Sequence, residues 1–380
     1  MDFQFFHELL SIDSTSGKER KVAEWLAGCL SGMFPQANRP VLRAEEVGDG
    51  TLNLLLTWGS PRIVFCSHLD TVPPYIPPSF PEGEFLSEPS LRDPSHQRWA
   101  PPSYAAEGGH RFGEELPLRK NAETQITGRG ACDAKGQVFA LVTTCQRLAE
   151  AGETDFGLLL LAGEETGSWG AKAFAKTGFR AEYLVVAEPT ENCMVSASKG
   201  TKSFDLKFTG EAFHSGYPQY GVSAVDLFVE FVNKLKHQDF CLDPLLGETT
   251  WNIGLVKSDN PQNILSPELT CRIYFRTTFL SDEAVSAWMA AAPALVDGRL
   301  TVTPRGGDTP ARYWTVDGLP SKPASFGSDA PHLTNFTHKA ICGPGSIRFA
   351  HRDDEHVLVA DLEKAVKQYL VIYSTARGTK

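Results

Sequence analysis

Residues 62–70 read Arg-Ile-Val-Phe-Cys-Ser-His-Leu-Asp, and this stretch decides the class of fold. A compact apolar run that ends in polar residues is typical of a buried strand that delivers side chains to the edge of a sheet. Similar strand patterns recur at 157–162 and 183–187, and helical spacing at 137–149 and 170–176. Strands that alternate with helices predict an α/β fold with a mostly parallel sheet, covered on both faces.

The two ends of the chain extend this pattern. Helical spacing over 3–10 is followed by Ser16 and Glu19, a capping-box signature that predicts a second helix to about residue 30. Alternating leucines from Leu52 predict a strand before the run at 62–67. Another strand is expected near Ala340, and a closing helix over 362–374.

The middle of the chain has a different order of elements. Strand patterns at 203–208, 251–256, 269–277 and 300–303 and helical patterns at 224–236 and 282–295 follow a β-α-β-β-α-β order. This order predicts a ferredoxin-like α+β domain inserted into the first one. We expect the insertion to cover 197–304, which leaves 1–196 and 305–380 as one discontinuous domain.

Length, charge and cysteine usage exclude several classes of protein. A chain of 380 residues is long enough for two or three domains. Thirty-six basic against 46 acidic residues give a net charge of −10, which argues against nucleic acid as a partner. No apolar run reaches the length of a membrane span and no basic leader precedes one, so we expect a cytoplasmic protein. The eight cysteines are scattered singly, which indicates reduced thiols rather than disulfides or a zinc ribbon.

Titratable side chains gather where the predicted strands end. They are His68 and Asp70, Asp133, Glu164 and Glu165, Glu188, and His351 near the C-terminus. The carboxyl ends of parallel strands meet at one edge of a sheet, so these charges would repel unless a cation lay among them. Imidazoles with several carboxylates suit a zinc-type ion, and a surplus carboxylate allows two ions about 3.5–4 Å apart.

A nucleotide-dependent enzyme is a weaker interpretation of the same chain. The glycine-rich segment 128–136 reads Gly-Arg-Gly-Ala-Cys-Asp-Ala-Lys-Gly, which matches neither common phosphate-binding pattern. The carboxylate of Asp133 at its centre would also repel a phosphate group.

Taken together and in order, six segments resemble the M20 family of metallopeptidases and deacylases. They are Ser-His-Leu-Asp-Thr-Val-Pro (67–73), the glycine-rich segment 128–136, Gly-Glu-Glu-Thr-Gly-Ser (163–168), Ala-Glu-Pro-Thr (187–190), Ala-Phe-His-Ser-Gly-Tyr-Pro (212–218) and Ala-His-Arg-Asp-Asp-Glu (350–355). The segments run over nearly the whole chain. The resemblance therefore implies a zinc-peptidase-like catalytic domain with an inserted lid.

The resemblance implies a role for each strand-end residue. His68, Asp133 and Glu188 would hold one zinc ion, and Asp133, Glu165 and His351 a second, with Co²⁺ as a possible substitute. Asp70 would orient the imidazole of His68 through its other ring nitrogen. Glu164 would act as the general base that takes a proton from the bridging water and returns it to the leaving amine.

The inserted domain would contribute the substrate-binding residues and the dimer interface. The resemblance implies that His214 reaches the active site of the partner subunit and donates to the developing oxyanion. Asn263 and Arg276 match lid positions that bind substrate, and Arg276 could pair with a substrate carboxylate. Gly327 and Ser328 match a turn whose backbone amides meet the same carboxylate. These expectations make the protein a homodimer.

Three functions remain open on the sequence alone. The leading one is a dizinc hydrolase that cleaves the amide bond of a small N-acyl amino acid, similar to acetylornithine deacetylase. A dipeptidase or carboxypeptidase with the same metal ligands is the alternative. An inactive binding protein on the same fold is a remote third possibility, because every ligand position and Glu164 are filled.

One segment departs from the family pattern. Residues 82–123 are rich in Pro, Gly, Ser and charge, and make a longer connection than the family usually has between Asp70 and Asp133. A loop of this length in a compact domain is either functional or partly disordered. We expect His96 and His110 within it to be surface residues rather than metal ligands.

Overall fold

The structure, a computed structural model, describes residues 1–81 and 123–378. These residues form two compact units. Unit 1 comprises Met1–Val195, Tyr313–Lys322 and Ser328–Lys380, and unit 2 comprises Ser196–Arg312 and Pro323–Gly327. The segment 82–122, with His96 and His110, lies outside the described residues, so the expectation that both are surface residues stays a prediction.

Unit 1 is built on a six-stranded sheet with the strand order β1-β2-β5-β3-β6-β14. Its strands are β1 (Val41–Val47), β2 (Thr51–Trp58), β3 (Ile63–His68), β5 (Phe156–Leu161), β6 (Ala181–Val186) and β14 (Phe336–Ile341). The pairs β5–β3, β3–β6 and β6–β14 are parallel, whereas β1–β2 and β2–β5 are antiparallel. The predicted α/β fold with a mostly parallel sheet is confirmed.

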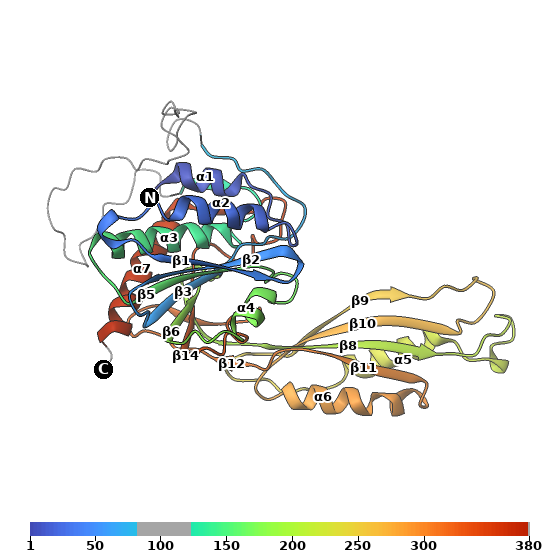
Figure 1. Ribbon diagram of the computed structural model, residues 1–380. Helices are drawn as coiled ribbons and strands as arrows, with labels where there is room; N and C mark the ends of the chain where they lie inside the picture. Colours follow the sequence, from blue (N-terminus) through green and yellow to red (C-terminus); the bar gives the residue numbers. More distant parts are fainter. Residues whose placement is uncertain (82–122, 379–380) are drawn as a thin grey trace. The chain divides into compact units, whose positions relative to one another are not determined.

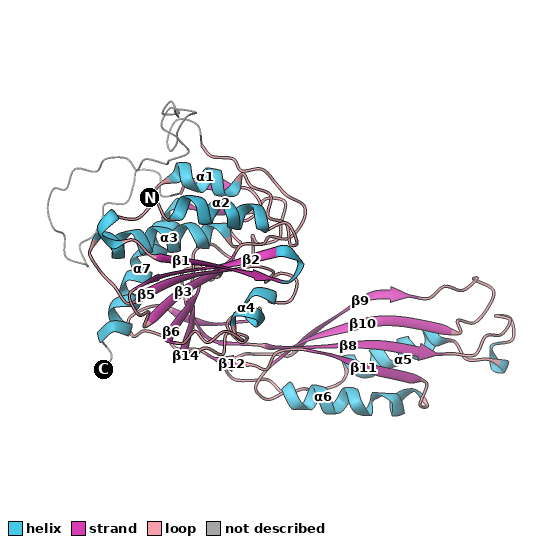
Figure 2. Ribbon diagram, viewed as in Figure 1, coloured by secondary structure: helices cyan, strands magenta, loops and turns pink. Residues whose placement is uncertain are grey.

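Helices cover the central strands of this sheet. The helices of unit 1 are α1 (Phe3–Leu10), α2 (Arg20–Leu30), α3 (Lys135–Glu150), α4 (Trp169–Phe174) and α7 (Val359–Gly378). Helices α1, α2 and α3 lie along one face of the sheet, and α7 packs against α3 (Figures 1 and 2). Every residue of β3 and β5 is buried, as expected of strands covered on both faces.

Unit 2 is a four-stranded antiparallel sheet with two helices. Strands β8 (Gly200–Thr209), β9 (Thr250–Lys257), β10 (Glu268–Thr277) and β11 (Leu300–Gly306) are arranged in the order β11-β8-β10-β9, and the helices are α5 (Ala224–Lys236) and α6 (Asp282–Ala291). Alternate residues of β10 from Leu269 to Phe275 are buried in one core with apolar side chains of both helices. The sequence order β8-α5-β9-β10-α6-β11 is the predicted β-α-β-β-α-β order.

Shorter elements complete the described structure. A three-stranded sheet is formed by β12 (Ala311–Arg312), β7 (Met194–Ser198) and β13 (Ser321–Ala324), and a two-stranded sheet by β15 (His356–Leu358) and β4 (Gln125–Thr127). Single 3₁₀ turns cover Gln36–Asn38, Gly48–Gly50, Pro218–Tyr220 and Ala292–Val296.

The structure corrects three local expectations. The predicted end of the insertion at 304 falls inside β11, which pairs with β8 up to Gly306, and unit 2 continues to Arg312. The helix predicted over 282–295 ends at Ala291, and a 3₁₀ turn that contains Pro293 follows, because proline removes a helical N–H donor. The predicted role of unit 2 as a lid and dimerisation domain stays a prediction.

The third correction concerns the start of α2. Ser16 does not cap this helix: α2 begins at Arg20, and Glu19 at its N-cap makes no side-chain capping bond. The hydroxyl of Ser16 instead donates to the Asp70 carboxylate at 2.9 Å, which is a contact between residues 54 positions apart. A tertiary partner has replaced the local cap.

All eight cysteines lie in the described part of the chain and are free thiols. Five of them are buried, in agreement with the expected reduced state. Within the described residues, no helix combines the length and the apolar character that crossing a membrane requires.

Candidate metal centre

The polar residues expected at strand ends lie at one edge of the sheet of unit 1. Strand β3 ends at His68 and is flanked by the parallel strands β5 and β6, which Glu164, Glu165 and Glu188 follow in the sequence. Asp133 lies in the turn before α3. Because parallel strands point the same way, their carboxyl ends bring these side chains together.

The first group of possible metal ligands is buried. The Nε2 atom of His68 lies 3.1 Å from Oδ1 of Asp133. Glu188 offers a ligand atom within 4.8 Å of both. Its Oε1 atom is buried and has no hydrogen-bond partner among the described residues, so it is a free acceptor where a cation would need one.

The second group uses the other oxygen of the same aspartate. The Nε2 atom of His351 lies 3.5 Å from Oδ2 of Asp133 and 3.0 Å from Oε1 of Glu165. The two groups therefore share Asp133, with one carboxylate oxygen facing each imidazole. The five ligands expected from the sequence lie together as the two predicted sets.

The electrostatics of the edge favour a bound cation. Six carboxyl groups, with only two imidazoles, contribute to this cluster: Asp70, Asp133, Glu164, Glu165, Glu188 and Asp329. Burial raises the pKa of Glu164 and of Glu188 well above the usual range of a glutamate, and neighbouring carboxylates raise both pKa values further. Without a cation these groups would take up protons, whereas divalent ions would balance their charge.

The pKa values of the two histidines are raised by carboxylates of the same cluster. Hydrogen bonds to Asp133 and Glu165 raise the pKa of His351 to about 10. Burial lowers the pKa of His68, but its hydrogen bonds to Asp133 and Asp70 outweigh burial and hold the pKa well above the usual value. Each imidazole is thus held by carboxylates at the nitrogen that a metal would use, and the donor set of imidazole and carboxylate groups fits a zinc-type ion.

Asp70 lies beside His68 and also contacts the loop that carries the two glutamates. His68 Nδ1 is 3.0 Å from the backbone oxygen of Asp70 and 3.4 Å from its Oδ1 atom. The amide N–H of Glu164 donates to Oδ1 of Asp70 at 2.9 Å, and that of Glu165 to Oδ2 at 3.0 Å. Asp70 therefore lies where it can orient the imidazole, and it binds the backbone of both glutamates as well.

A buried ion pair that the sequence analysis did not single out supports Asp133. Oε1 of Glu355 accepts the amide N–H groups of Gly130, Cys132 and Asp133 at 2.9, 3.1 and 3.0 Å. Its Oε2 atom pairs with Nη1 of Arg129 at 2.5 Å. Glu355 lies within the segment 350–355 already quoted, but nothing local distinguishes it from the neighbouring Asp353 and Asp354.

Asp329 is the second residue that the sequence analysis did not single out. It directly follows Gly327 and Ser328, is buried, and has an Oδ1 atom without a hydrogen-bond partner among the described residues. Burial raises its pKa to about 7, although the charge of His68 and a hydrogen bond from Ser168 lower it in part.

The remaining predicted site residues fall mostly in unit 2. His214 pairs with Ile264 in a short bridge, and the N–H of Ser215 donates to the backbone oxygen of Asn263 at 2.9 Å. Asn263 and His214 are thus neighbours within this unit. The exposed residues Phe213 and Tyr220 lie on either side of His214 in the sequence, and their ring centroids are 5.5 Å apart.

Arg276 and Gly327 are also neighbours in unit 2. The guanidinium of Arg276 lies over the ring of Tyr274, at 5.0 Å from its centroid, and a Cβ atom at Gly327 would lie 4.0 Å from Nη1 of Arg276. Among the described residues, no carboxylate forms an ion pair with Arg276. Ser328 belongs to unit 1, where its hydroxyl accepts the N–H of Ala330 at 3.3 Å.

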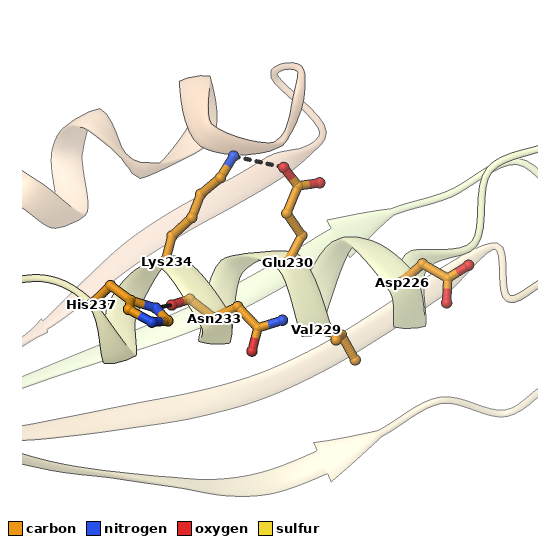
Figure 3. A pocket seen from close by; sticks show the side chains of 6 residues that line it. All are labelled: Asp226, Val229, Glu230, Asn233, Lys234 and His237. Atoms are coloured by element: carbon orange, nitrogen blue, oxygen red, sulfur yellow. Dashed lines mark hydrogen bonds and ion pairs between the residues drawn. The ribbon is translucent and has the colours of Figure 1, made fainter.

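Two hollows in the structure lie away from the metal groups. One of about 440 Å³ follows α5 and is lined by Asp226, Val229, Glu230, Asn233, Lys234 and His237 (Figure 3). Its main charges are already paired, since Lys234 binds Glu230 at 2.6 Å. The other hollow, of about 400 Å³, is lined by residues at the N-terminal ends of β3 and β5, among them Arg62 and Asp155. The metal groups lie at the C-terminal ends of these strands.

Comparison with known proteins identifies relatives over nearly the whole chain. The model of peptidase family M20/M25/M40 matches residues 110–374. A protein from Aspergillus oryzae named probable carboxypeptidase is 30% identical, over 96% of this chain and 88% of its own length. An M20 domain-containing protein from Schizosaccharomyces pombe is 29% identical, over 96% of this chain and 83% of its own.

Solved structures with the same fold include peptidases. A tripeptidase from Staphylococcus aureus superimposes with a TM-score of 0.74 at 18% identity, covering 99% of this chain and 98% of that one. An M20 family metallo-carboxypeptidase from Sulfolobus solfataricus gives a TM-score of 0.66 at 15% identity, covering 96% and 97%. At these identities the likeness establishes the fold.

The Glu355–Arg129 pair generates a stability prediction. Glu355→Ala leaves a buried guanidinium and three amide groups without their partner, so we expect the free energy of unfolding to fall by about 3–5 kcal/mol. Glu355→Gln keeps an oxygen that can accept the amide groups and should cost less. Urea denaturation followed by circular dichroism measures both changes. Equal unfolding midpoints for Glu355→Ala and the wild type would show that the pair does not stabilise the Asp133 turn.

Proposed function

The chain belongs to peptidase family M20/M25/M40, and from this premise we propose that it is a metal-dependent carboxypeptidase. It would hydrolyse the amide bond that joins a C-terminal amino acid to the rest of a short peptide. The observation that carries metal-dependent hydrolysis is the sharing of Asp133, whose two carboxylate oxygens face one imidazole each. The names of the relatives at about 30% identity support the carboxypeptidase assignment.

We further propose two divalent ions, zinc in the first instance with cobalt as a substitute. His68 and Glu188 would complete one site with Asp133, and Glu165 and His351 the other. Bound ions of this kind lower the pKa of a water molecule and polarise the scissile carbonyl. The unpartnered Oε1 of Glu188 and the six crowded carboxyl groups support two ions rather than none.

Glu164 is the proposed general base. Its backbone is held by Asp70, and its side chain lies close enough to His68 and Asp133 for their charges to alter its pKa. A carboxylate at this place can accept a proton during attack on the carbonyl and return it to the leaving amine. Glu165, the next residue, contacts His351 instead, so the two neighbours have different partners.

Unit 2 supplies most of the proposed contacts to substrate, and Ser328 of unit 1 adds one. Arg276 would pair with the α-carboxylate of the C-terminal residue, because two N–H groups of a guanidinium match the two oxygens of a carboxylate. Its position beside Gly327, and its lack of an acidic partner among the described residues, support this role. Asn263 and Ser328 would assist binding of the same substrate, and His214, donated by a partner subunit, would bind the oxyanion.

An N-acyl amino acid deacylase of the acetylornithine deacetylase type is the second candidate. Its substrate also carries an α-carboxylate next to the scissile amide, so Arg276 and the metal ligands fit it equally well. The reaction differs only in the acyl group. An inactive binding protein is disfavoured, because every proposed ligand and Glu164 are present.

A substrate panel tests the proposed function. We expect hydrolysis of short peptides with release of the C-terminal residue, and no hydrolysis of the same peptides with an amidated C-terminus, which lack the charge that Arg276 would bind. N-acetyl, N-succinyl and N-formyl amino acids are the comparison set, and higher kcat/KM on them would favour the deacylase. Dialysis against a chelator should abolish activity, and zinc or cobalt should restore it. Full activity in metal-free protein would exclude the proposed mechanism.

The adjacent glutamates can be separated by substitution. Glu164→Gln should retain metal but lower kcat by about 10²–10⁴, which is the usual contribution of a positioned acid-base group. Glu165→Gln should instead weaken the binding of one metal ion, measured by metal analysis after dialysis. If Glu164→Gln loses metal while Glu165→Gln retains it and is inactive, the two roles are reversed.

Subunit complementation tests the role of His214. Mixing inactive His214→Ala chains with inactive Glu164→Gln chains should restore activity, because one site of a mixed dimer then has both residues intact. Random exchange puts about half of the dimers in the mixed state, so recovery should approach a quarter of wild-type activity. A pull-down with tagged chains checks that subunits exchange. Exchange without recovery would mean that His214 does not act across subunits.

A further inference from the structure

One buried guanidinium contacts segments from distant parts of the chain at the edge that carries the metal groups. Arg129 lies shortly before Asp133 in the sequence, and only 1% of it is exposed. Its Nε atom donates to the backbone oxygen of Pro74 at 3.1 Å. Its Nη1 atom donates to the backbone oxygen of Arg352 at 3.1 Å and pairs with Oε2 of Glu355 at 2.5 Å. Arg129 therefore joins the segment after β3 to the segment 350–355.

The partners of Arg129 lie beside proposed metal ligands. Arg352 is next to His351 in the sequence. The carboxylate of Glu355 binds the turn that carries Asp133, because its Oε1 atom accepts the N–H of Asp133 at 3.0 Å and two further N–H groups of the same turn. The ion pair of Arg129 and Glu355 thus links the backbone around Asp133 to the backbone around His351.

The two metal groups differ in what the sheet does for them. His68 is the last residue of β3 and pairs with Leu161 of β5, and Glu188 directly follows a residue bonded to β3. Asp133 and His351 lie in turns instead, and His351 has a φ angle of +65°, which is uncommon for residues other than glycine. Strand pairing therefore supports the first group, whereas the second depends on contacts between loops.

Stability alone is a weak reason for a buried ion pair of this kind. Removing two charges from water is costly, and apolar side chains of similar volume often stabilise a protein interior as well or better. A guanidinium differs from other cations in holding several acceptors in fixed directions. Arg129 uses this property on two backbone oxygens and one carboxylate, so its contacts fix the relative positions of three segments.

We propose that Arg129 and Glu355 form a clamp that positions Asp133 and His351 and so builds the second metal group. Both are positioning residues, because they act through the backbone of the segments that carry the ligands. The consequence of this clamp for hydrolysis rests on the proposed function. The contacts of the clamp are independent of it, so the two statements can be tested separately.

Arg129→Lys tests the contacts of the clamp. This variant keeps the positive charge, but one ammonium group cannot bind Pro74, Arg352 and Glu355 in the directions of a guanidinium. Hydrogen exchange of the full-length protein after chelation, measured by mass spectrometry, should be about tenfold faster or more in the segment 128–133, because local opening becomes easier.

Zinc binding tests the effect on the second metal group. In calorimetric titrations of metal-free protein with zinc, we expect two ions per wild-type chain. Arg129→Lys should bind the second ion about 10- to 100-fold more weakly, the usual effect of losing a partner that orients a ligand. The affinity for the first ion should change less, since paired strands support His68 and Glu188.

Glu355→Gln provides an independent variant if Arg129→Lys does not fold. It keeps an oxygen that can accept the three amide groups but loses the ion pair, so affinity for the second ion should fall while exchange at 128–133 stays close to that of the wild type. Because the two residues act as one clamp, the double variant should bind the second ion little more weakly than Arg129→Lys alone.

Kinetics test the consequence for catalysis. Arg129→Lys should lower kcat by about 10- to 100-fold, because small misplacements of reacting groups have effects of this size. KM should change little, since Arg276 and the other proposed substrate contacts of unit 2 are untouched. Added zinc should restore part of kcat, which a general loss of stability would not predict.

Arg62→Lys is the matched control. Arg62 also binds a carboxylate, that of Glu182 at 2.6 Å, and a backbone oxygen, that of Arg377 at 3.1 Å, but it lies before β3 at the end of the sheet remote from the metal groups. The control should leave exchange at 128–133, affinity for the second ion and kcat unchanged.

Two results would overturn the clamp: wild-type exchange and wild-type affinity for the second ion in Arg129→Lys, or an equal effect of Arg62→Lys on both. If the wild type binds no zinc or hydrolyses no substrate of the panel, the proposed function fails. Exchange at 128–133 in the metal-free protein then still decides whether Arg129 and Glu355 hold the turn of Asp133.

Discussion

Buried negative charge at one edge of a parallel sheet is the constraint on which the rest of this structure depends. Six carboxyl groups and two imidazoles meet where β3, β5 and β6 end, most of them out of contact with water. Such a group is stable only if protons or cations balance it. The sharing of Asp133 between two imidazoles, and the open Oε1 atom of Glu188, fit cations at two adjoining places. The sheet therefore holds these side chains where the proposed ions would balance their charge.

The same constraint explains how the loops around the edge are fixed. Carboxylates that do not face the metal groups bind backbone amides instead: Glu355 binds three N–H groups around Asp133, and Asp70 binds those of Glu164 and Glu165. An amide N–H carries partial positive charge and loses little freedom when it is already part of a tight turn. Each such bond both lowers the cost of a buried carboxylate and orients a neighbouring ligand. Electrostatic balance and positioning are thus achieved by the same contacts.

The two units divide the proposed chemistry between them. All proposed metal ligands and the general base belong to unit 1, whereas His214, Asn263, Arg276 and Gly327 belong to unit 2. Relatives with different names, a carboxypeptidase and a tripeptidase among them, share the family or the fold over nearly the whole chain. Proteins that share a fold and its reactive groups can act on different substrates, because other residues bind the substrate. This division explains why the ligand set identifies hydrolysis but does not distinguish a C-terminal peptide from an N-acyl amino acid.

The sequence by itself determined the fold class and the order of elements in unit 2, because both depend on local periodicity. The resemblance of its motifs to the M20 family implied the five metal-group residues, which the structure brings together. Its local rules failed where a distant partner competes: Ser16 binds Asp70 rather than capping α2. Only the tertiary structure decided the role of Glu355, whose partners are amides and a guanidinium far away in the chain, such as Arg129 at a separation of 226 residues. A buried acidic residue in a loop has the same local signature as an exposed one. The difference arises from burial and from which N–H groups the fold brings to its oxygens.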